Sequence, residues 1–384
     1  MSEAIEQSII RRSPLDEMHR NLGAMLAERD GWIIPVSYGD SSSEYAAVRD
    51  GAAGLIDLSS RARIEVSGAE AVQFLNGLVT NDVKSLEEGA WISAAFPNVQ
   101  GRLLANTRVL RRGDKFLFDT EAATHERVLK TLERFTLAGD FHVADTTAQT
   151  ALLSVQGARA GEIVGAILGD EAARVEHARL AVVTWRDSRI TVIHATHTAE
   201  DGFDLFTDAT AAPELWEALT SAGARPVGFE ALETLRIEAG LPRYGVDMSD
   251  TNVVLEAALD DAVSYTKGCY IGQEIIARIH WRGHVAKRLA GLSFDDADDK
   301  AAPPHDSRIR AIDGKEIGRV TSSTFSPRLK RVVALGYVRY DYLAPGTEVR
   351  VVTEGGEHTA HVAEVPMVRG SWYEGAAPTE GANQ

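Results

Sequence analysis

The amino-acid sequence predicts an α+β protein of several domains that ends in a small all-β module. The chain has 384 residues, 44% of them hydrophobic, and the core of a chain this long usually divides into two or three domains. Helix and strand patterns intermingle up to about residue 288. From there to Val368 the sequence has only short strand patterns and turns rich in Gly, Pro and Asp. This composition is typical of a small β barrel or sandwich.

The first half of the chain alternates between strand and helix patterns. The stretch GWIIPVSYGD reads as a short apolar strand, followed by a helix from about Ser42. RARIEVSG alternates polar and apolar residues, which predicts a half-buried strand, and the next helix has Ala71, Leu75 and Leu78 at helical spacing. Residues 89–120 read as three successive strands with turns at 97–101 and 112–114. A helix is expected from about residue 123 to residue 135.

The second half continues in the same mixed way. TALLSVQGARAGEIVGAIL predicts a strand and a helix, and residues 178–208 predict a set of antiparallel strands. APELWEALTSAG predicts a helix, and another follows in GFEALETLRIEAG, closed by Gly240. A third helix is expected to begin close to Gly272, because Ile275, Ile276 and Ile279 then share one face.

Composition excludes several classes of protein. The net charge of −16 repels polyanions, so non-specific nucleic-acid binding is not expected. No apolar run is long enough to span a bilayer, and the N-terminus lacks the pattern of a secretory signal. The single cysteine excludes an internal disulfide and fits a reducing compartment. We therefore expect a cytoplasmic protein without membrane contact, and a monomer, since nothing reads as a coiled coil.

The common motifs for nucleotides, hydrolase nucleophiles and zinc are absent. The sequence lacks GxxxxGK[ST], GxGxxG after a strand, GxSxG, HExxH and CxxC. His280 and His284 are spaced like metal ligands, but no carboxylate nearby completes a set. We therefore expect no metal site.

The lone cysteine, Cys269, lies in the stretch YTKGCYIGQEIIAR. It should precede the N-terminus of the helix that starts near Gly272, where free backbone N–H groups favour an anion. Lys267 adds a positive charge two residues away, and both effects favour a thiolate. The alternative is that Cys269 is a small buried residue in a glycine turn, because free cysteines are among the most buried residues. The pattern alone leaves both interpretations open.

The motif KGCYIGQE resembles the signature K-G-C-[FY]-x-G-Q-E of the YgfZ family, folate-binding proteins linked to the maintenance of iron–sulfur enzymes. All seven specified positions match. Further segments, among them AGLIDLSSRARIEVSG, LETLRIEAGLPRYGVDM and VALGYVRYDYLAPGTEV, resemble landmarks of the wider glycine-cleavage T-protein superfamily. This resemblance implies a three-domain cloverleaf fold around a central hole that holds tetrahydrofolate, with a C-terminal β barrel.

The resemblance also implies domain boundaries. Residues 1–50 and 147–227 would form a ferredoxin-like α+β domain, and residues 51–146 and 228–286 a central domain that carries KGCYIGQE. The barrel would occupy residues 287–370, and residues 371–384 would form a disordered tail.

Folate-site residues follow from the same resemblance. Glu200 in AEDGFDLF matches a pterin-binding glutamate, and a carboxylate can accept two hydrogen bonds from a pterin. Arg236 matches an arginine that faces the folate, where a guanidinium suits the anionic glutamate tail. Asn106 stands in place of the T-protein's catalytic aspartate, and it and Gln273 complete the expected ligand contacts. The alternatives are a hairpin-turn acid for Glu200 and an ion pair with Glu233 or Glu238 for Arg236.

Three functions are compatible with these features. The first is a tetrahydrofolate-binding protein that assists the assembly or repair of iron–sulfur clusters in client enzymes, with Cys269 and Lys267 as its chemical groups. The second is a tetrahydrofolate-dependent aminomethyl or methyl transferase of the T-protein type. Asn106 argues against ordinary aminomethyl transfer, because an amide cannot act as a carboxylate base. The third is a folate-sensing scaffold without chemistry.

Overall fold

The computed structural model describes residues 10–295 and 301–373. An N-terminal sheet has the order β1-β3-β2, with β1 (Arg11–Arg12) parallel to β3 (Trp32–Ser37) and β2 (Met25–Arg29) antiparallel to it. Two helices accompany this sheet, α1 (Asp16–Asn21) and α2 (Ser41–Arg49). The Asp40 carboxylate accepts the free N–H groups of Ser42 and Ser43, so α2 begins at Ser41.

A five-stranded antiparallel sheet forms the next unit. Its order is β6 (Trp91–Pro97), β7 (Leu103–Arg112), β8 (Lys115–Thr120), β5 (Ala62–Ser67) and β9 (His142–Asp145). Helices α3 (Ala71–Leu78) and α4 (His125–Glu133) pack against one face through a core that includes Leu75, Phe118 and Leu132. The helix expected from about residue 123 begins with a 3-10 turn, η1 (Ala122–Thr124), which leads directly into α4.

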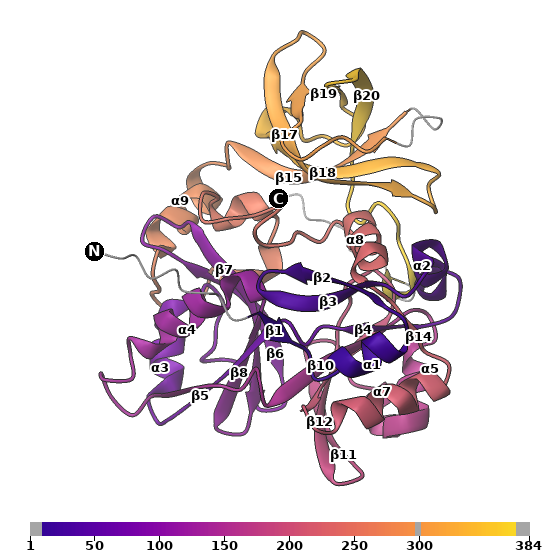
Figure 1. The fold of residues 1–384 in the computed structure, drawn as a ribbon. Helices are drawn as coiled ribbons and strands as arrows, with labels where there is room; N and C mark the ends of the chain where they lie inside the picture. Colours follow the sequence, from indigo (N-terminus) through magenta and orange to yellow (C-terminus); the bar gives the residue numbers. More distant parts are fainter. Residues whose placement is uncertain (1–9, 296–300, 374–384) are drawn as a thin grey trace, which may run out of the picture.

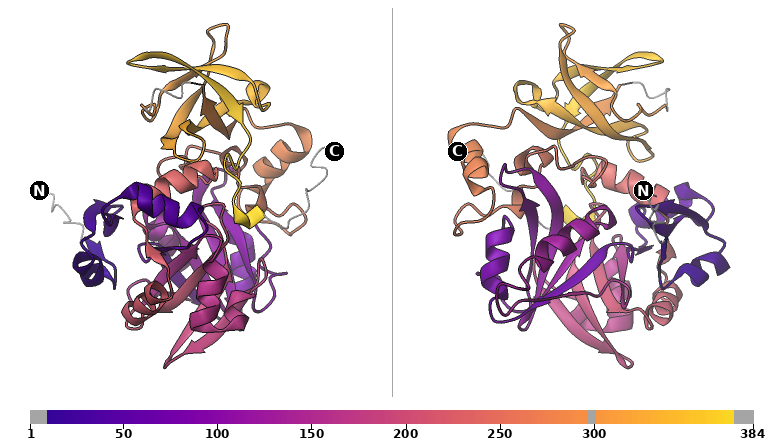
Figure 2. Two further views of the ribbon diagram at one scale, coloured as in Figure 1. Left: turned by 90° about the vertical axis from the view of Figure 1, so that its right-hand side faces the viewer. Right: turned by 60° about the vertical axis from the view of Figure 1, so that its left-hand side comes forward.

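A six-stranded sheet packs against the five-stranded sheet. Its order is β11 (Leu180–Trp185), β12 (Ser188–His194), β13 (Gly202–Asp208), β10 (Thr150–Gln156), β4 (Gly54–Asp57) and β14 (Arg225–Pro226). Helices α5 (Ala160–Leu168), α6 (Asp170–Ala173) and α7 (Ala212–Ser221) cover its outer face. The inner faces of the two sheets share one apolar cluster, with Leu110 and Leu117 from the first and Leu152 and Phe206 from the second. The sheets therefore pack face to face (Figure 2).

The C-terminal part is a closed six-stranded barrel (Figure 1). Its strands are β15 (Lys287–Phe294), β18 (Arg331–Arg339), β17 (Glu316–Ser326), β16 (Arg308–Arg310), β19 (Glu348–Thr353) and β20 (Gly356–Ala363). The barrel rests on α8 (Phe229–Glu238), where Ile237 packs against Leu289, Val333 and Leu335. Helix α9 (Gln273–Arg282) precedes the barrel, and the short turns η2 (Val254–Ala257), η3 (Asp260–Ala262), η4 (Tyr340–Tyr342) and η5 (Ser371–Tyr373) complete the elements.

The expected boundaries differ from the sheets in two places. Residues 54–57 were expected in the central domain, but β4 pairs with β10 and β14 in the six-stranded sheet. The first fifty residues contribute no strand to that sheet, since β1–β3 form their own. Residues 374–384 of the expected tail lie outside the described residues, whereas Ser371–Tyr373 forms η5. In the described ranges, no helix is long and apolar enough to cross a membrane.

Candidate functional site

A cavity of about 1040 Å³, including its open mouth, lies where the N-terminal sheet, the β4–β5 connection, the end of β8 and helix α8 meet. Its lining combines apolar and charged side chains, as the pockets for small molecules do. Part of its wall is apolar, formed by Ile34, Pro35, Ile56, Leu58, Val227, Phe229, Leu232, Leu241 and Pro242. The charged and polar lining residues are Arg29, Asp30, Asp57, Ser60, Arg61, Glu121, His197, Glu233, Arg236 and Arg243.

Glu121 is the first residue after β8 and lines this cavity. Both of its carboxylate oxygens accept the backbone N–H of Tyr244, at 3.1 and 3.2 Å. Burial raises the pKa of Glu121 to about 7, against the opposing effects of the Arg61 charge and the Tyr244 N–H. Glu121 is therefore a carboxyl group that changes charge near neutral pH.

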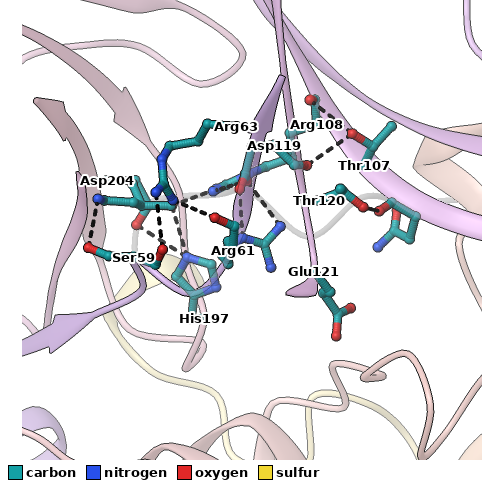
Figure 3. A network of polar contacts seen from close by, with 12 residues as sticks. Ser59, Arg61, Arg63, Thr107, Arg108, Asp119, Thr120, Glu121, His197 and Asp204 are labelled. Carbon is teal, nitrogen blue, oxygen red and sulfur yellow. Dashed lines mark hydrogen bonds and ion pairs between the residues drawn. The ribbon is translucent and has the colours of Figure 1, made fainter. Parts of the chain in front are cut away.

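A chain of buried ion pairs runs from the cavity to the contact between the two sheets (Figure 3). Arg61 binds Asp119 with two hydrogen bonds, of 2.7 and 3.0 Å. Arg108 on β7 binds Asp119 and also Asp204 on β13, both at 2.6 Å, and so bridges the two sheets. Burial alone would raise the pKa of Asp204, but the charges of His197 and Arg108 lower it below its ordinary value. The network is a fixed, ionised scaffold on one side of the cavity.

Arg236 lies on the cavity wall, yet its N–H groups are all engaged. Its Nε and Nη2 donate to Glu233 at 3.2 and 2.9 Å, and Nη1 donates to Asp247 at 2.6 Å. The remaining N–H groups reach the carbonyl of Leu241 and the hydroxyl of Ser322. The ion pair with Glu233, one of the two sequence-based interpretations, is therefore present. In this arrangement the guanidinium of Arg236 has no free N–H group left to donate to a folate tail.

Glu200 is buried away from the cavity. Its carboxylate accepts Nη1 of Arg49 at 2.8 Å and both the N–H and the hydroxyl of Ser371 at 2.7 Å. The Arg49 side chain is 2% exposed, and it also binds Glu238 at 2.8 Å. Glu238 in turn accepts the hydroxyl of Ser326 on β17. Its oxygens thus belong to an internal cluster in this structure, and the expected pterin contact of Glu200 stays a prediction.

Asn106 lies on β7, two residues before Arg108, and thus shares its face of the sheet. This face is the one that reaches Asp204 on the opposite sheet. Asn106 is half-buried and is not among the residues that line the cavity. The structure places the residue between the sheets, beside the ion-pair network.

The loop that carries Cys269 is separate from the cavity, since none of its residues lines the wall. The cysteine is exposed, so the interpretation as a buried filler is wrong. Lys267 is buried, and its ammonium donates to the carbonyls of Asn76, Val79 and Asn81 at 2.7–2.8 Å. Burial lowers the pKa of Lys267 to about 8. The lysine thus ties its loop to the end of α3.

Gly272 and Gln273 complete this loop. Gly272 precedes α9 with a φ of 77°, and a Cβ there would lie 2.4 Å from the carbonyl oxygen of Asn98. Only glycine fits this position without strain. Gln273 is the first residue of α9, and its amide lies 3.5 Å from the carbonyl of Gly268. The predicted helix start near Gly272 is confirmed, but Gln273 does not reach the cavity.

The structure thus brings only Arg236, of the predicted site residues, to the cavity wall. Sequence reasoning missed Glu121, Arg61 and His197, which line the cavity with it. Within the described residues, no group of three or more His, Cys, Asp or Glu side chains could hold a metal ion.

Comparisons with known proteins identify the family. Residues 15–267 match the GCVT N-terminal domain, and residues 287–368 match the glycine cleavage T-protein C-terminal barrel domain. The chain belongs to the glycine cleavage T-protein family. The crystal structure of the glycine cleavage system aminomethyltransferase T from Bartonella henselae superposes with a TM-score of 0.85 at 26% identity. The match covers 94% of this chain and 98% of that one.

Curated relatives of the T-protein family match along nearly the whole chain. An aminomethyltransferase of Rubrobacter xylanophilus is 34% identical, covering 87% of this chain and 89% of its own. An aminomethyltransferase of Symbiobacterium thermophilum is also 34% identical, and the match covers 94% of this chain and 98% of that protein. The predicted fold class, mixed α and β with a C-terminal barrel, is confirmed. The superfamily assignment is confirmed as well, whereas YgfZ membership stays a prediction.

Proposed function

We propose that this protein binds a reduced folate in the central cavity and transfers a one-carbon group between the folate and an acceptor. The observation that carries the proposal is the full-length similarity to aminomethyltransferases, combined with a cavity where the units of the fold meet. The apolar wall, including Ile56, Leu58 and Leu232, suits a flat ring. Arg29 and Asp30 are exposed at the mouth, where the Arg29 charge suits the anionic tail of a folate.

A bound folate would supply the nitrogen atoms that carry the one-carbon group. The chain's own residues would position the folate and exclude water, with the Arg61–Asp119 pair fixed beside it. Asn106 cannot stabilise a developing positive charge as an aspartate would. We therefore expect any transfer of an aminomethyl group to be slow, and a methyl or other one-carbon group to be the better substrate.

Binding and turnover test this function together. Calorimetry of the purified protein with tetrahydrofolate should show micromolar binding, and exchange of Arg29 for alanine should weaken the binding of polyglutamylated folate more than that of the bare pterin. An Asn106→Asp variant should transfer an aminomethyl group faster than the wild type, with Asn106→Ala as the matched control. Absence of folate binding would refute the proposal.

A second function remains because Cys269 is exposed within a complete KGCYIGQE motif. In this proposal, the protein assists the assembly or repair of iron–sulfur clusters in client enzymes through that thiol. Cys269→Ala should then abolish rescue of client activity while folate affinity stays unchanged. Full rescue by the alanine variant would remove the thiol from the mechanism and leave the transferase function.

A further inference from the structure

A second cavity opens between the two packed sheets, at the end that lies away from the barrel. It occupies about 1580 Å³, including its open mouth, and it is lined by the turn of the β7–β8 hairpin and by parts of β11 and β12. Figure 1 shows the β11–β12 hairpin at the bottom of the molecule and the barrel at the top. No residue lines both this cavity and the central one. The two cavities are therefore separate sites.

Polar side chains replace apolar ones on the inner faces of the sheets at this end. Leu110 on β7 and Ile193 on β12 belong to the apolar cluster between the sheets. Alternate residues of a strand face the same side, so Arg112 shares the inner face of β7 with Leu110. By the same alternation, Arg189 and Thr191 share the inner face of β12 with Ile193. The apolar layer thus ends in one arginine from each sheet, and both arginines line the cavity.

The positive charges at this place are only partly compensated. Glu65 on β5 is shared by Lys115 at 2.7 Å and Arg112 at 3.3 Å. Arg112 also donates to the hydroxyl of Thr191, at 3.4 Å, and both of its contacts are long for N–H···O hydrogen bonds. Arg189 is exposed and forms no ion pair within residues 10–295 and 301–373. Three cations, Arg112, Lys115 and Arg189, therefore have one bound carboxylate among them.

The other charged residues of the lining do not compensate these three cations. Arg111 donates to the carbonyl of Leu86 at 2.7 Å and so forms part of the wall. Four further acids line the cavity, and in the part of the chain that the structure describes none of them forms an ion pair with the three cations. These acids are Glu88, Glu171, Asp187 and Asp208.

The two arginines repel each other. Burial lowers the pKa of the Arg112 guanidinium, and the charge of Arg189 lowers it further, whereas the charge of Glu65 acts in the opposite direction. The like charges therefore lie close enough across the cavity to destabilise one another. An anion bound between them would remove this repulsion and supply acceptors for their N–H groups.

We propose that Arg112, Lys115 and Arg189 form a binding site for a small oxyanion of the phosphate type, either the free inorganic ion or the phosphate group of a larger molecule. A guanidinium presents paired N–H groups that match two oxygens of a phosphate. The hydroxyl of Thr191 accepts from Arg112 and has its own proton left to donate to the anion. The site goes beyond the proposed function, because it lies apart from the central cavity.

Calorimetry with inorganic phosphate tests this site, at neutral pH and with the ionic strength held constant by sodium chloride. The wild type should bind phosphate saturably. Arg189→Ala should weaken the binding by about tenfold to a hundredfold, the loss expected for a hydrogen bond between charged groups. Arg189 is exposed, so the variant should fold, and an unchanged thermal unfolding midpoint verifies this. Arg186→Ala is the matched control, because Arg186 lies on the same hairpin, pairs with Glu214 and does not line the cavity.

Phenyl phosphate serves as a second probe, which separates the two sources of the anion. Binding of inorganic phosphate alone through Arg189 would assign the site to the free ion. Binding of phenyl phosphate through Arg189 would assign it to the phosphate group of a larger molecule. The inference is overturned if the wild type binds neither probe saturably, or if Arg189→Ala binds as well as the wild type. An equal loss of affinity in Arg189→Ala and Arg186→Ala would also overturn it, since that result reports only the net charge of the surface.

Discussion

Removing the charge of Glu121 should change how the stability of the protein depends on pH, even without a ligand. The perturbation is Glu121→Gln, which keeps the shape and the contact with the Tyr244 N–H but cannot ionise. The folded pKa is about 7, against 4.5 for an exposed glutamate. Because the folded pKa is raised, the native state holds the proton more tightly than the unfolded state between these values.

The sign of the effect follows directly. The stability that Glu121 contributes is fully present below about pH 4.5 and is lost as the pH rises through about 7. At 1.36 kcal/mol per pKa unit, the loss is about 3 kcal/mol over this window. The wild type should therefore lose about 3 kcal/mol relative to Glu121→Gln between about pH 4.5 and about pH 7.5.

Urea unfolding at several pH values measures this difference. Only the difference between wild type and variant is used, so the titration of other groups cancels. Glu133→Gln, an exposed glutamate at the end of α4, is the matched control and should run parallel to the wild type. Parallel curves for wild type and Glu121→Gln would refute the argument that burial governs this carboxyl group.

Three further predictions concern stability. Lys267→Met should lower the free energy of unfolding by about 3 kcal/mol, since each of the three carbonyls left without its partner costs about 1 kcal/mol or more. An unchanged urea midpoint would contradict the argument that Lys267 holds its loop to the end of α3. Asp204→Asn should destabilise by about 3 kcal/mol, because it leaves a buried guanidinium partly uncompensated, and thermal unfolding measures this. Gly272→Ala should cost at least about 2 kcal/mol, since it combines a φ of 77° with a clash against a carbonyl oxygen. Gly268→Ala, where a Cβ meets nothing within 4 Å, should stay within about 0.5 kcal/mol of wild type in the same assay.

Local chemistry made some features predictable from the sequence. The start of α9 follows from a glycine placed just before isoleucines at helical spacing, and the structure begins the helix at Gln273. The ion pair of Arg236 with Glu233 follows from their spacing within one helix, and it forms. Both depend only on neighbours along the chain.

Other features depend on contacts between distant segments. Glu121 follows a buried strand like many surface acids, and its contact with the backbone N–H of Tyr244, more than a hundred residues away, arises only in the folded chain. Glu200 was assigned by its surrounding motif, but its partners Arg49 and Ser371 come from opposite ends of the chain. Similarly, the sequence pattern predicts no strand at residues 54–57, and nothing local tells which sheet β4 joins.

The cluster around Arg49 has a consequence for how the molecule can move. One guanidinium holds α2 to Glu200 before β13 and to Glu238 on α8. Those carboxylates in turn hold Ser371 near the chain's end and Ser326 on the barrel. A hinge motion between the barrel and the rest of the chain would have to break this buried cluster, so the two parts should stay locked together. If the proposed folate binds in the cavity, it would enter and leave beside the exposed Arg29 and Asp30, with local side-chain motion instead of lobe opening.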